Sequence, residues 1–298
     1  MTSLRDLAEL VRAPAALTVP GDTLAGAASA GWPAGARTAA LPVASTCLYW
    51  AGMALNDWAD RQVDAVERPE RPIPSGRVPA GTALAVAGTL TAAGVAAAAV
   101  GGGRRSAATA VVLAAAVWAY DLSPKQGALS LATMASTRGL DVLLGASAGG
   151  LSGLRAAALP AAMVAVHTAG VTALSRGEVH GGSTGVARAC VAATALVGAA
   201  SALRPVPTAS RGRAGGVLGA AVSVALTGAY AVSVLRAQLS AVRSPDAGTV
   251  RRATGAGIRG LVPLQSAALA ASGHHAAALG LVASAPVGGA LMRKMSAT

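Results

Sequence analysis

Asparagine and aspartate side chains gather in one stretch of this chain, NDWADRQVDAVERPERPIPSG at residues 56–76. On a continuing helix, spacings of three and four residues place Asp57, Asp60 and Asp64 on one face, with Asn56 one turn before Asp60. Carboxylates this close repel one another unless a cation lies between them. Their hard oxygen atoms suit Mg²⁺, which usually binds one or two carboxylates together with waters and phosphate oxygens. The spacing therefore predicts a magnesium site.

Two arginines, Arg68 and Arg71, follow these carboxylates. A guanidinium group carries a planar fork of N–H donors that matches phosphate oxygens. The RPIPSG segment then brings two prolines and a glycine close together, which indicates an ordered turn. We therefore expect a metal–diphosphate site at the cytosolic mouth of a helical bundle. The alternative is a solvated loop beside the membrane, whose charges only set the topology.

The elements around this stretch are too apolar for a soluble domain, because 53% of the 298 residues are hydrophobic and only 12% are charged. Apolar runs near twenty residues long match a bilayer core of about 30 Å. The fold class is therefore all-α: a polytopic membrane helical bundle of nine or ten spans in the lipid bilayer. The expected spans are 13–31, 38–56, 80–101, 106–122, 126–150, 156–176, 186–203 and 214–235, with one broken span or a tight hairpin between 257 and 292.

The net charge of +12 does not indicate a nucleic-acid partner, because its distribution follows membrane topology. With the N-terminus in the cytosol, fourteen basic residues fall in cytosolic segments and seven in outer ones, and all ten acidic residues outside the spans are cytosolic. We expect a multi-pass protein of the plasma membrane with its active-site loops in the cytosol. Residues 1–12 lack a signal-peptide cleavage pattern and fit an amphipathic helix on the membrane surface.

Ionisable residues inside spans are costly, so they usually face a cavity or pair with each other. Asp22 lies in the first expected span without a nearby partner in the sequence, which favours a functional role. Arg138 and Asp141 are three residues apart on one helical face and are expected to form a structural pair. His167 shares a helical face with Glu178, eleven residues later. Asp22, Asp141 and His167 could surround an acceptor, whereas the alternative makes His167 a hydrogen-bonded core residue.

The acidic stretch resembles the UbiA superfamily of intramembrane prenyltransferases. NDWADRQVD matches its NDxxDxxxD signature, and ERPERPIPSG matches the Arg–x–x–Arg–Pro–x–x–Ser–Gly run that follows it there. The resemblance implies that the whole chain, 1–298, is one domain with a central cavity that opens laterally to lipid. It also implies roles in holding magnesium on an isoprenyl diphosphate and in gripping the diphosphate. These roles fall on Asn56, Asp57, Asp60, Asp64, Arg68 and Arg71.

Two further segments bear on this resemblance. YDLSPK, at the end of the fourth expected span, matches the family's pattern of a Tyr and a Lys with Tyr120 and Lys125. Lys125 would offer a charge to the diphosphate or act as an ordinary positive-inside anchor. After the sixth span the family has a second acidic motif, but here the segment reads SRGEVHGGSTG, with Arg176, Glu178 and His180 and no Asp. Glu178 would be the remaining metal ligand there, and the layout resembles an EboC-type subgroup of the superfamily.

The resemblance implies an enzyme that moves an isoprenyl group from its diphosphate to a lipophilic acceptor, either aromatic or lipid, with Mg²⁺ assisting departure of the diphosphate. Two alternatives remain. The first is an intramembrane terpene cyclase, and the second is a non-catalytic prenyl-lipid-binding or export protein. Catalytic roles are expected for Asp60, Asp64, Arg68 and Lys125. Substrate contacts are expected from Asn56, Arg68, Arg71, Tyr120, Lys125, Arg176, Glu178, Asp22 and His167.

Overall fold

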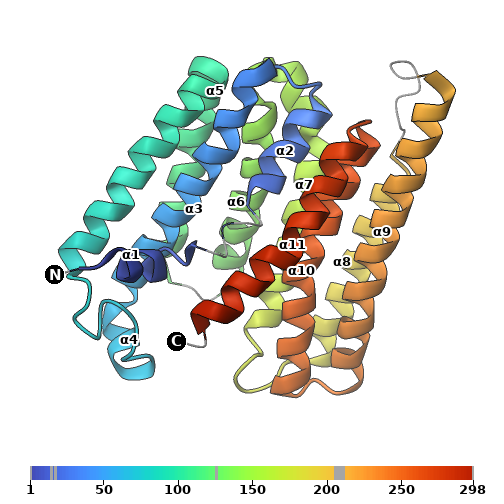
Figure 1. Cartoon of the computed structure of the whole chain (residues 1–298). Helices are drawn as coiled ribbons and strands as arrows, with labels where there is room; N and C mark the ends of the chain where they lie inside the picture. The colour runs from blue at the N-terminus through green and yellow to red at the C-terminus, as the bar shows by residue number, and fades with distance from the viewer. Residues whose placement is uncertain (1, 14–15, 17–18, 125–126, 205–211, 297–298) are drawn as a thin grey trace.

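The computed structural model describes residues 2–13, 16, 19–124, 127–204 and 212–296, and within these ranges the chain is helical without a strand (Figure 1). The all-α expectation is confirmed. The α-helices are α1 (Leu4–Leu10), α2 (Pro20–Ser29), α3 (Ala40–Ala59), α4 (Arg61–Glu67), α5 (Ala80–Leu122), α6 (Gly127–Ala146), α7 (Gly150–Ser175), α8 (Thr184–Ala202), α9 (Gly212–Arg243), α10 (Ala247–Ala271) and α11 (His275–Ser296). Short 3₁₀ turns, η2 (Gly35–Ala39) and η3 (Ser147–Gly149), precede α3 and α7.

Five helical stretches of the described chain are long and apolar enough to cross a membrane: Gly35–Ala59, Ala80–Leu122, Gly127–Ser175, Thr184–Ala202 and Val217–Arg243. A span needs about 20 residues, so the stretches of 43 and 49 residues are each long enough to cross twice. The backbone turns within both of them. Gly103 has a φ of +70° in the middle of α5, and Gly150 has a φ of +61° at the start of α7. The chain is an integral membrane protein.

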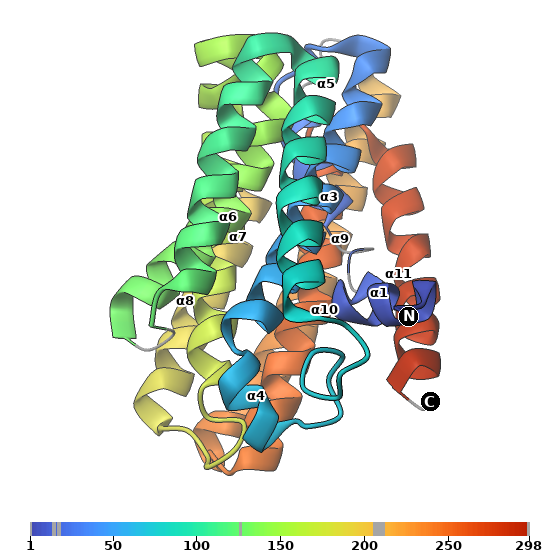
Figure 2. The same ribbon diagram turned by 90° about the vertical axis from the view of Figure 1, so that its left-hand side faces the viewer.

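The long helices run roughly parallel (Figures 1 and 2). Small residues let some of them approach to backbone contact. At the crossing of α2 and α6, a Cβ on Gly26 would clash with the Val142 carbonyl oxygen. A Cβ on Gly145 would clash with the Thr23 carbonyl oxygen. Close packing of this kind holds helices together in lipid, where the hydrophobic effect offers little. These two glycines therefore set the distance between α2 and α6.

The last apolar region forms two helices joined by a tight turn, as the hairpin alternative describes, while the count of nine or ten spans stays a prediction. The turn between α10 and α11 contains Gly273, whose φ is +81°. The turn is fastened to the end of α2, because Trp32 Nε1 donates to His274 Nε2 at 2.8 Å. The preceding helix α10 begins at Ala247, ten residues before the expected region. The Asp246 side chain caps the start of α10 by accepting a hydrogen bond from the Thr249 amide.

The N-terminal helix α1 runs across the long helices rather than along them (Figure 2). It begins with a capping box in which Ser3 and Asp6 bond reciprocally. Its last residue, Leu10, is fully buried in a cluster that includes Leu55 of α3 and Val78 of the loop before α5. The segment thus packs against the bundle. Its expected place on a membrane surface stays a prediction.

Candidate functional site

The acidic stretch lies at the end of α3, at the same end of the bundle as the turn after α7 and the α9–α10 connection (Figure 1). A single helix through the stretch is wrong, because α3 ends at Ala59 and Asp60 leaves helical geometry with a φ of −86° and a ψ of 2°. The hydrogen-bonding pattern nevertheless continues. The Asp60 amide donates to the Asn56 carbonyl at 2.9 Å, and the Asp64 amide donates to the Asp60 carbonyl at 2.8 Å. The break therefore bends the acidic face without dispersing it.

Arg71 joins two of the predicted carboxylates. Its Nη1 lies 2.6 Å from Asp64 Oδ2 and 3.3 Å from Asp57 Oδ1. Asp57 and Asp64 are only 3% and 2% exposed, so each needs such a partner to stay ionised. The structure thus brings together three residues that the spacing assigned to metal and diphosphate.

A second arginine, which the sequence analysis did not assign to the site, reaches Asp57 from the N-terminal segment. Arg12 Nη2 lies 2.7 Å from Asp57 Oδ1, and its Nη1 lies 2.9 Å from Met53 Sδ. The backbone of Arg12 has a φ of +48°, a conformation that non-glycine residues rarely adopt. The only signal in the sequence was a basic residue next to Ala-Pro before the first apolar run, which topology alone could explain.

Asp121 is a second residue that the sequence analysis missed. It lies near the end of α5, is 5% exposed, and accepts a hydrogen bond from Asn56 Nδ2 at 3.2 Å. A Cβ on Gly52 would lie 3.6 Å from Asp121 Oδ2, so this carboxylate rests over the last turns of α3. The signal was an acid beside Tyr120 in YDLSPK. Asp121 adds a buried carboxylate to the signature Asn.

The remaining residues of the first motif are more open. The Arg68 side chain is 53% exposed and its Nη1 lies 3.9 Å from Asp64 Oδ1. Asp60 and Tyr120 are half-buried. Lys125, which was expected to reach the diphosphate, lies outside the described residues.

The segment that replaces the second acidic motif forms a turn after α7. Arg176 is exposed and donates from Nη2 to the Gly127 carbonyl at 2.7 Å. Glu178 is half-buried, and its backbone carbonyl accepts from Arg251 Nη2 at 3.0 Å. A cavity of about 550 Å³ opens beside Arg176, lined mainly by apolar residues of α6, α7, α8 and α10.

The oxygen donors of the first motif suit a hard divalent ion. Within the described part of the chain, however, no three carboxylate, histidine or cysteine side chains converge on one point. Asp57 and Asp64 are instead neutralised by Arg12 and Arg71. The donor chemistry therefore fits a divalent ion, whereas this arrangement of side chains places guanidinium groups against the carboxylates.

The expected pairing of Arg138 with Asp141 is wrong, because the ion pair of Arg138 is with Asp22, Nη2 to Oδ2 at 2.9 Å. Asp22 is fully buried and also accepts from Gln265 Nε2 at 2.6 Å. Asp141 instead accepts from Ser45 Oγ at 2.6 Å. Asp22 therefore has two partners from distant helices, where the sequence offered none nearby.

His167 is buried with both ring nitrogens engaged. Its Nδ1 lies 3.0 Å from the Tyr230 hydroxyl, and its Nε2 lies 2.9 Å from the Gly257 carbonyl oxygen. The rings of His167 and Tyr230 also meet edge to face, with their centroids 5.3 Å apart. This geometry matches the core-histidine alternative, and a role for His167 at the acceptor stays a prediction.

Two kinds of curated protein are similar to part of this chain. Digeranylgeranylglyceryl phosphate synthase of Natronomonas pharaonis is 42% identical over 79 residues, which cover 26% of this chain and 28% of that protein. The bacteriochlorophyll synthase 33 kDa chain of Cereibacter sphaeroides is 39% identical over 71 residues, 24% of this chain and 23% of that one. The chain therefore matches only about a quarter of the length of these curated relatives.

The fold extends the likeness over most of the chain. A UbiA homologue from Aeropyrum pernix K1 superposes with a TM-score of 0.66 at 19% identity, covering 85% of this chain and 96% of that one. A structure of digeranylgeranylglyceryl phosphate synthase superposes with a TM-score of 0.64 at 15% identity, covering 91% and 99%. The sequence model of the UbiA prenyltransferase family matches residues 16–247, most of the chain. This chain belongs to the UbiA prenyltransferase family.

Proposed function

We propose that the protein is an intramembrane prenyltransferase that moves an isoprenyl group from an isoprenyl diphosphate to a lipophilic acceptor, aromatic or lipid. The observation that carries this proposal is the meeting of Asp57, Asp64, Arg12 and Arg71 where α3 leaves the apolar bundle. A donor with a long apolar chain and a highly charged head needs both environments at one place. The prenyl chain would lie among the apolar helices, and the head would bind at this polar end.

In this proposal two half-buried arginines, Arg12 and Arg71, bind the diphosphate. Arg12 and Arg71 are held against carboxylates in the described arrangement, and a guanidinium fork binds phosphate at least as readily as carboxylate. When donor enters, the arginines turn toward its oxygens and leave Asp57 and Asp64 in need of a new cation. The exposed Arg68 would bind the diphosphate from the open side, and Tyr120 and Lys125 would keep the substrate-binding roles that the sequence predicts.

Once the arginines have turned away, the carboxylates of Asp57 and Asp64 would be available to bind a divalent ion. UbiA prenyltransferases generally use a divalent metal, and we propose Mg²⁺ here because the donors are oxygens. Asn56, Asp57, Asp60 and Asp64 would hold it, Asp121 would orient Asn56, and Glu178 would be the ligand contributed by the second segment. When bound, Mg²⁺ supplies positive charge that stabilises the departing diphosphate.

The proposed reaction needs no covalent nucleophile on the protein. The C–O bond between the prenyl carbon and the diphosphate breaks, and its electron pair leaves with the diphosphate. The arginines stabilise the charge that develops there. The acceptor then forms the new bond to the allylic carbon and releases a proton. The apolar bundle keeps water from the allylic cation. Asp22 and His167 would face the acceptor only if their present partners were displaced.

We further propose that the protein lies in the plasma membrane with this polar end in the cytosol, in line with the excess of basic residues there. The EboC-type subgroup also stays a proposal, supported by the SRGEVHGG segment at residues 175–182. In this segment one carboxylate, Glu178, stands where the family has two or more.

The proposal is tested with purified protein in nanodiscs, Mg²⁺ and isoprenyl diphosphates of several chain lengths. Release of diphosphate that requires an added aromatic or lipid acceptor supports transfer. Release without acceptor, with hydrocarbon or terpene alcohol products, would assign a cyclase instead. Binding of prenyl lipid without any release would assign an accessory role. Asp60→Ala should abolish turnover, while Glu67→Ala, an exposed acid on the neighbouring helix α4, should leave it within about twofold of the unmodified protein.

A further inference from the structure

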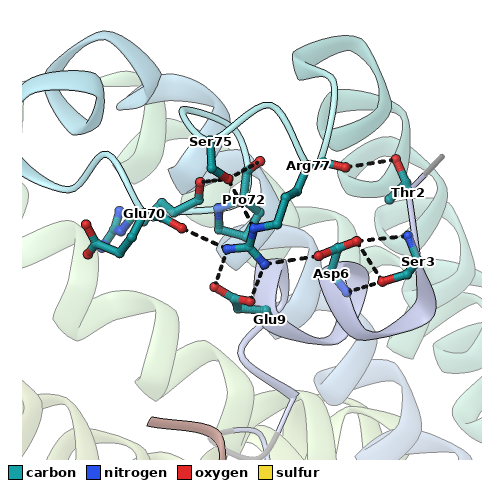
Figure 3. A network of polar contacts seen from close by, with 9 residues as sticks. Thr2, Ser3, Asp6, Glu9, Glu70, Pro72, Ser75 and Arg77 are labelled. Atoms are coloured by element: carbon teal, nitrogen blue, oxygen red, sulfur yellow. Dashed lines mark hydrogen bonds and ion pairs between the residues drawn. The ribbon is translucent and has the colours of Figure 1, made fainter. Parts of the chain in front are cut away.

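A network of charged side chains centres on Arg77, in the loop between α4 and α5 (Figure 3). Its guanidinium forms a bidentate pair with Glu9, Nη1 to Oε2 at 2.6 Å and Nη2 to Oε1 at 2.8 Å. Nη1 also donates to Asp6 Oδ1 at 3.0 Å. Nη2 donates to the Glu70 carbonyl at 2.7 Å, and Nε donates to Ser75 Oγ at 3.1 Å. The guanidinium therefore holds helix α1 and its own loop at the same time.

Two other contacts reinforce this junction. The Thr2 hydroxyl donates to the Arg77 carbonyl at 3.3 Å, so the backbone of Arg77 is tied to the N-terminal segment as well (Figure 3). On the inner side, Leu10 at the end of α1 and Val78 next to Arg77 are both fully buried in one apolar cluster. Polar contacts outside and apolar contacts inside thus join the same two segments.

Each of these segments carries one of the arginines that reach Asp57. Arg12 lies two residues beyond the end of α1, and Arg71 lies six residues before Arg77 in the loop. The loop is compact, because the Ser75 amide donates to the Arg71 carbonyl and the Val78 amide donates to the Pro72 carbonyl. Movement of α1 away from the loop would therefore carry Arg12 away from Arg71.

We propose that Arg77 is a positioning residue for donor binding: it locks α1 to the 68–79 loop, so that Arg12 and Arg71 face Asp57 from two separate parts of the chain. This inference rests on the proposed function, because its consequence is the binding of a diphosphate. Arg77 touches neither Asp57 nor Asp64 in the described contacts, so it acts through the two arginines. A bidentate, charge-assisted pair is the kind of contact that fixes orientation as well as distance.

The lock is tested first without any reaction. In a protein whose Cys47 and Cys190 are replaced by Ser, spin labels are placed at Leu4→Cys on α1 and Val66→Cys on α4, both 84% exposed or more. The distance between them should be narrowly distributed, and Arg77→Ala should broaden it. Glu9→Gln, which removes one charge and keeps the side-chain shape, should broaden it less. Arg5→Ala removes an exposed charge from the same helix and is the matched control, with no change expected.

The second measurement is calorimetric binding of inorganic diphosphate, followed by steady-state kinetics. Arg77→Ala should weaken diphosphate binding and raise KM for the donor by about tenfold, with kcat changed by less than about threefold. Arg77→Lys, which keeps the charge but loses the bidentate fork, should lie between Arg77→Ala and the unmodified protein. A loss confined to kcat, or unchanged binding despite a broadened distance, would overturn the positioning role.

The two proposals fail in different ways. If the unmodified protein binds no diphosphate and turns over no donor, the proposed function is wrong, whereas the spin-label distances still decide whether Arg77 locks α1. If the unmodified protein turns over donor but Arg77→Ala keeps both the narrow distance and the full affinity, the lock is wrong and the function stands.

Discussion

Arg71 Nη1 lies 2.6 Å from Asp64 Oδ2, and the same nitrogen lies 3.3 Å from Asp57 Oδ1, across the helix break at Asp60. One guanidinium therefore stands between two carboxylates that the chain buries almost completely. Buried carboxylates without a cation would repel each other and lose their charge.

Replacing Arg71 with Ala should destabilise the fold as well as impair the site. Breaking a buried ion pair costs about 3–5 kcal/mol, and we expect on the order of 3 kcal/mol because Arg12 still serves Asp57. Arg68→Ala is the control for stability, since its exposed side chain should contribute less than about 1 kcal/mol. Equilibrium unfolding in mixed detergent measures the free energy of unfolding of both variants. Equal stability of the two variants would contradict the central place of Arg71.

Divalent ion and diphosphate should bind cooperatively, because each ligand releases protein groups that the other needs. Mg²⁺ alone must compete with Arg12 and Arg71 for Asp57 and Asp64. Diphosphate draws these arginines away, so its presence should tighten Mg²⁺ binding by about tenfold, within the usual range of coupling between sites. Calorimetric titration of Mg²⁺ with and without diphosphate measures the effect, after correction for Mg²⁺–diphosphate complexes in solution. Identical protein-bound affinities in the two titrations would rule out the exchange.

Gly145→Ala should weaken the α2–α6 contact. The added methyl would clash with the Thr23 carbonyl oxygen, so the two helices must separate, at a cost of about 1–3 kcal/mol. Gly88→Ala is the matched control, because no atom lies within 4 Å of its added Cβ. This control should be neutral or more stable by up to about 1 kcal/mol, from helix propensity. Thermal unfolding of both variants decides the point, and a stable Gly145→Ala variant would count against backbone contact.

Arg138→Leu should be among the most destabilising changes in the spans. It leaves Asp22, fully buried and bonded to Gln265, without its cationic partner, at a cost of about 3–5 kcal/mol. Adding Asp22→Asn should recover much of the loss, because a neutral amide is cheaper to bury than an unpaired charge. A double-mutant cycle of unfolding free energies gives the coupling between the two residues. Additive losses would show that the ion pair carries no energy of its own.

Acid should release α1 from the bundle at low pH. The Ser3 hydroxyl and amide, with Arg77, lower the pKa of Asp6 from 3.8 to about 2, and the hydrogen bonds from Arg77 lower the pKa of Glu9 below its usual 4.5. A lowered folded-state pKa means that stability is present above the unfolded value and is lost as pH falls through the folded value. The Leu4–Val66 spin-label distance should therefore stay narrow above about pH 4 and broaden toward pH 2.

Ser3→Ala provides the control for this titration. Removing the hydroxyl deletes the largest cause of the lowered pKa of Asp6, so the broadening should begin at higher pH than in the unmodified protein. An unchanged onset in Ser3→Ala would assign the release to other groups.

The sequence by itself determined the fold class of this protein and predicted the location of its candidate site. Apolar runs long enough to span a bilayer required helices, and the NDxxDxxxD spacing marked where α3 leaves the apolar bundle. Both are local properties, because helical periodicity relates residues only a few positions apart. Asp57, Asp64 and Arg71 are near neighbours in the chain, so the contacts of Arg71 with both carboxylates could be predicted.

Only the tertiary structure decided which distant groups bond to the buried carboxylates. Arg12 reaches Asp57 across 45 positions, Asn56 reaches Asp121 across 65, and Gln265 reaches Asp22 across 243. The local pairing of Arg138 with Asp141 was wrong for the same reason, since Asp22 on a neighbouring helix supplies the partner. Spacing along the chain fixes which face of a helix a residue occupies. The packing of one helix against another fixes which charge it meets, and no local pattern encodes that choice.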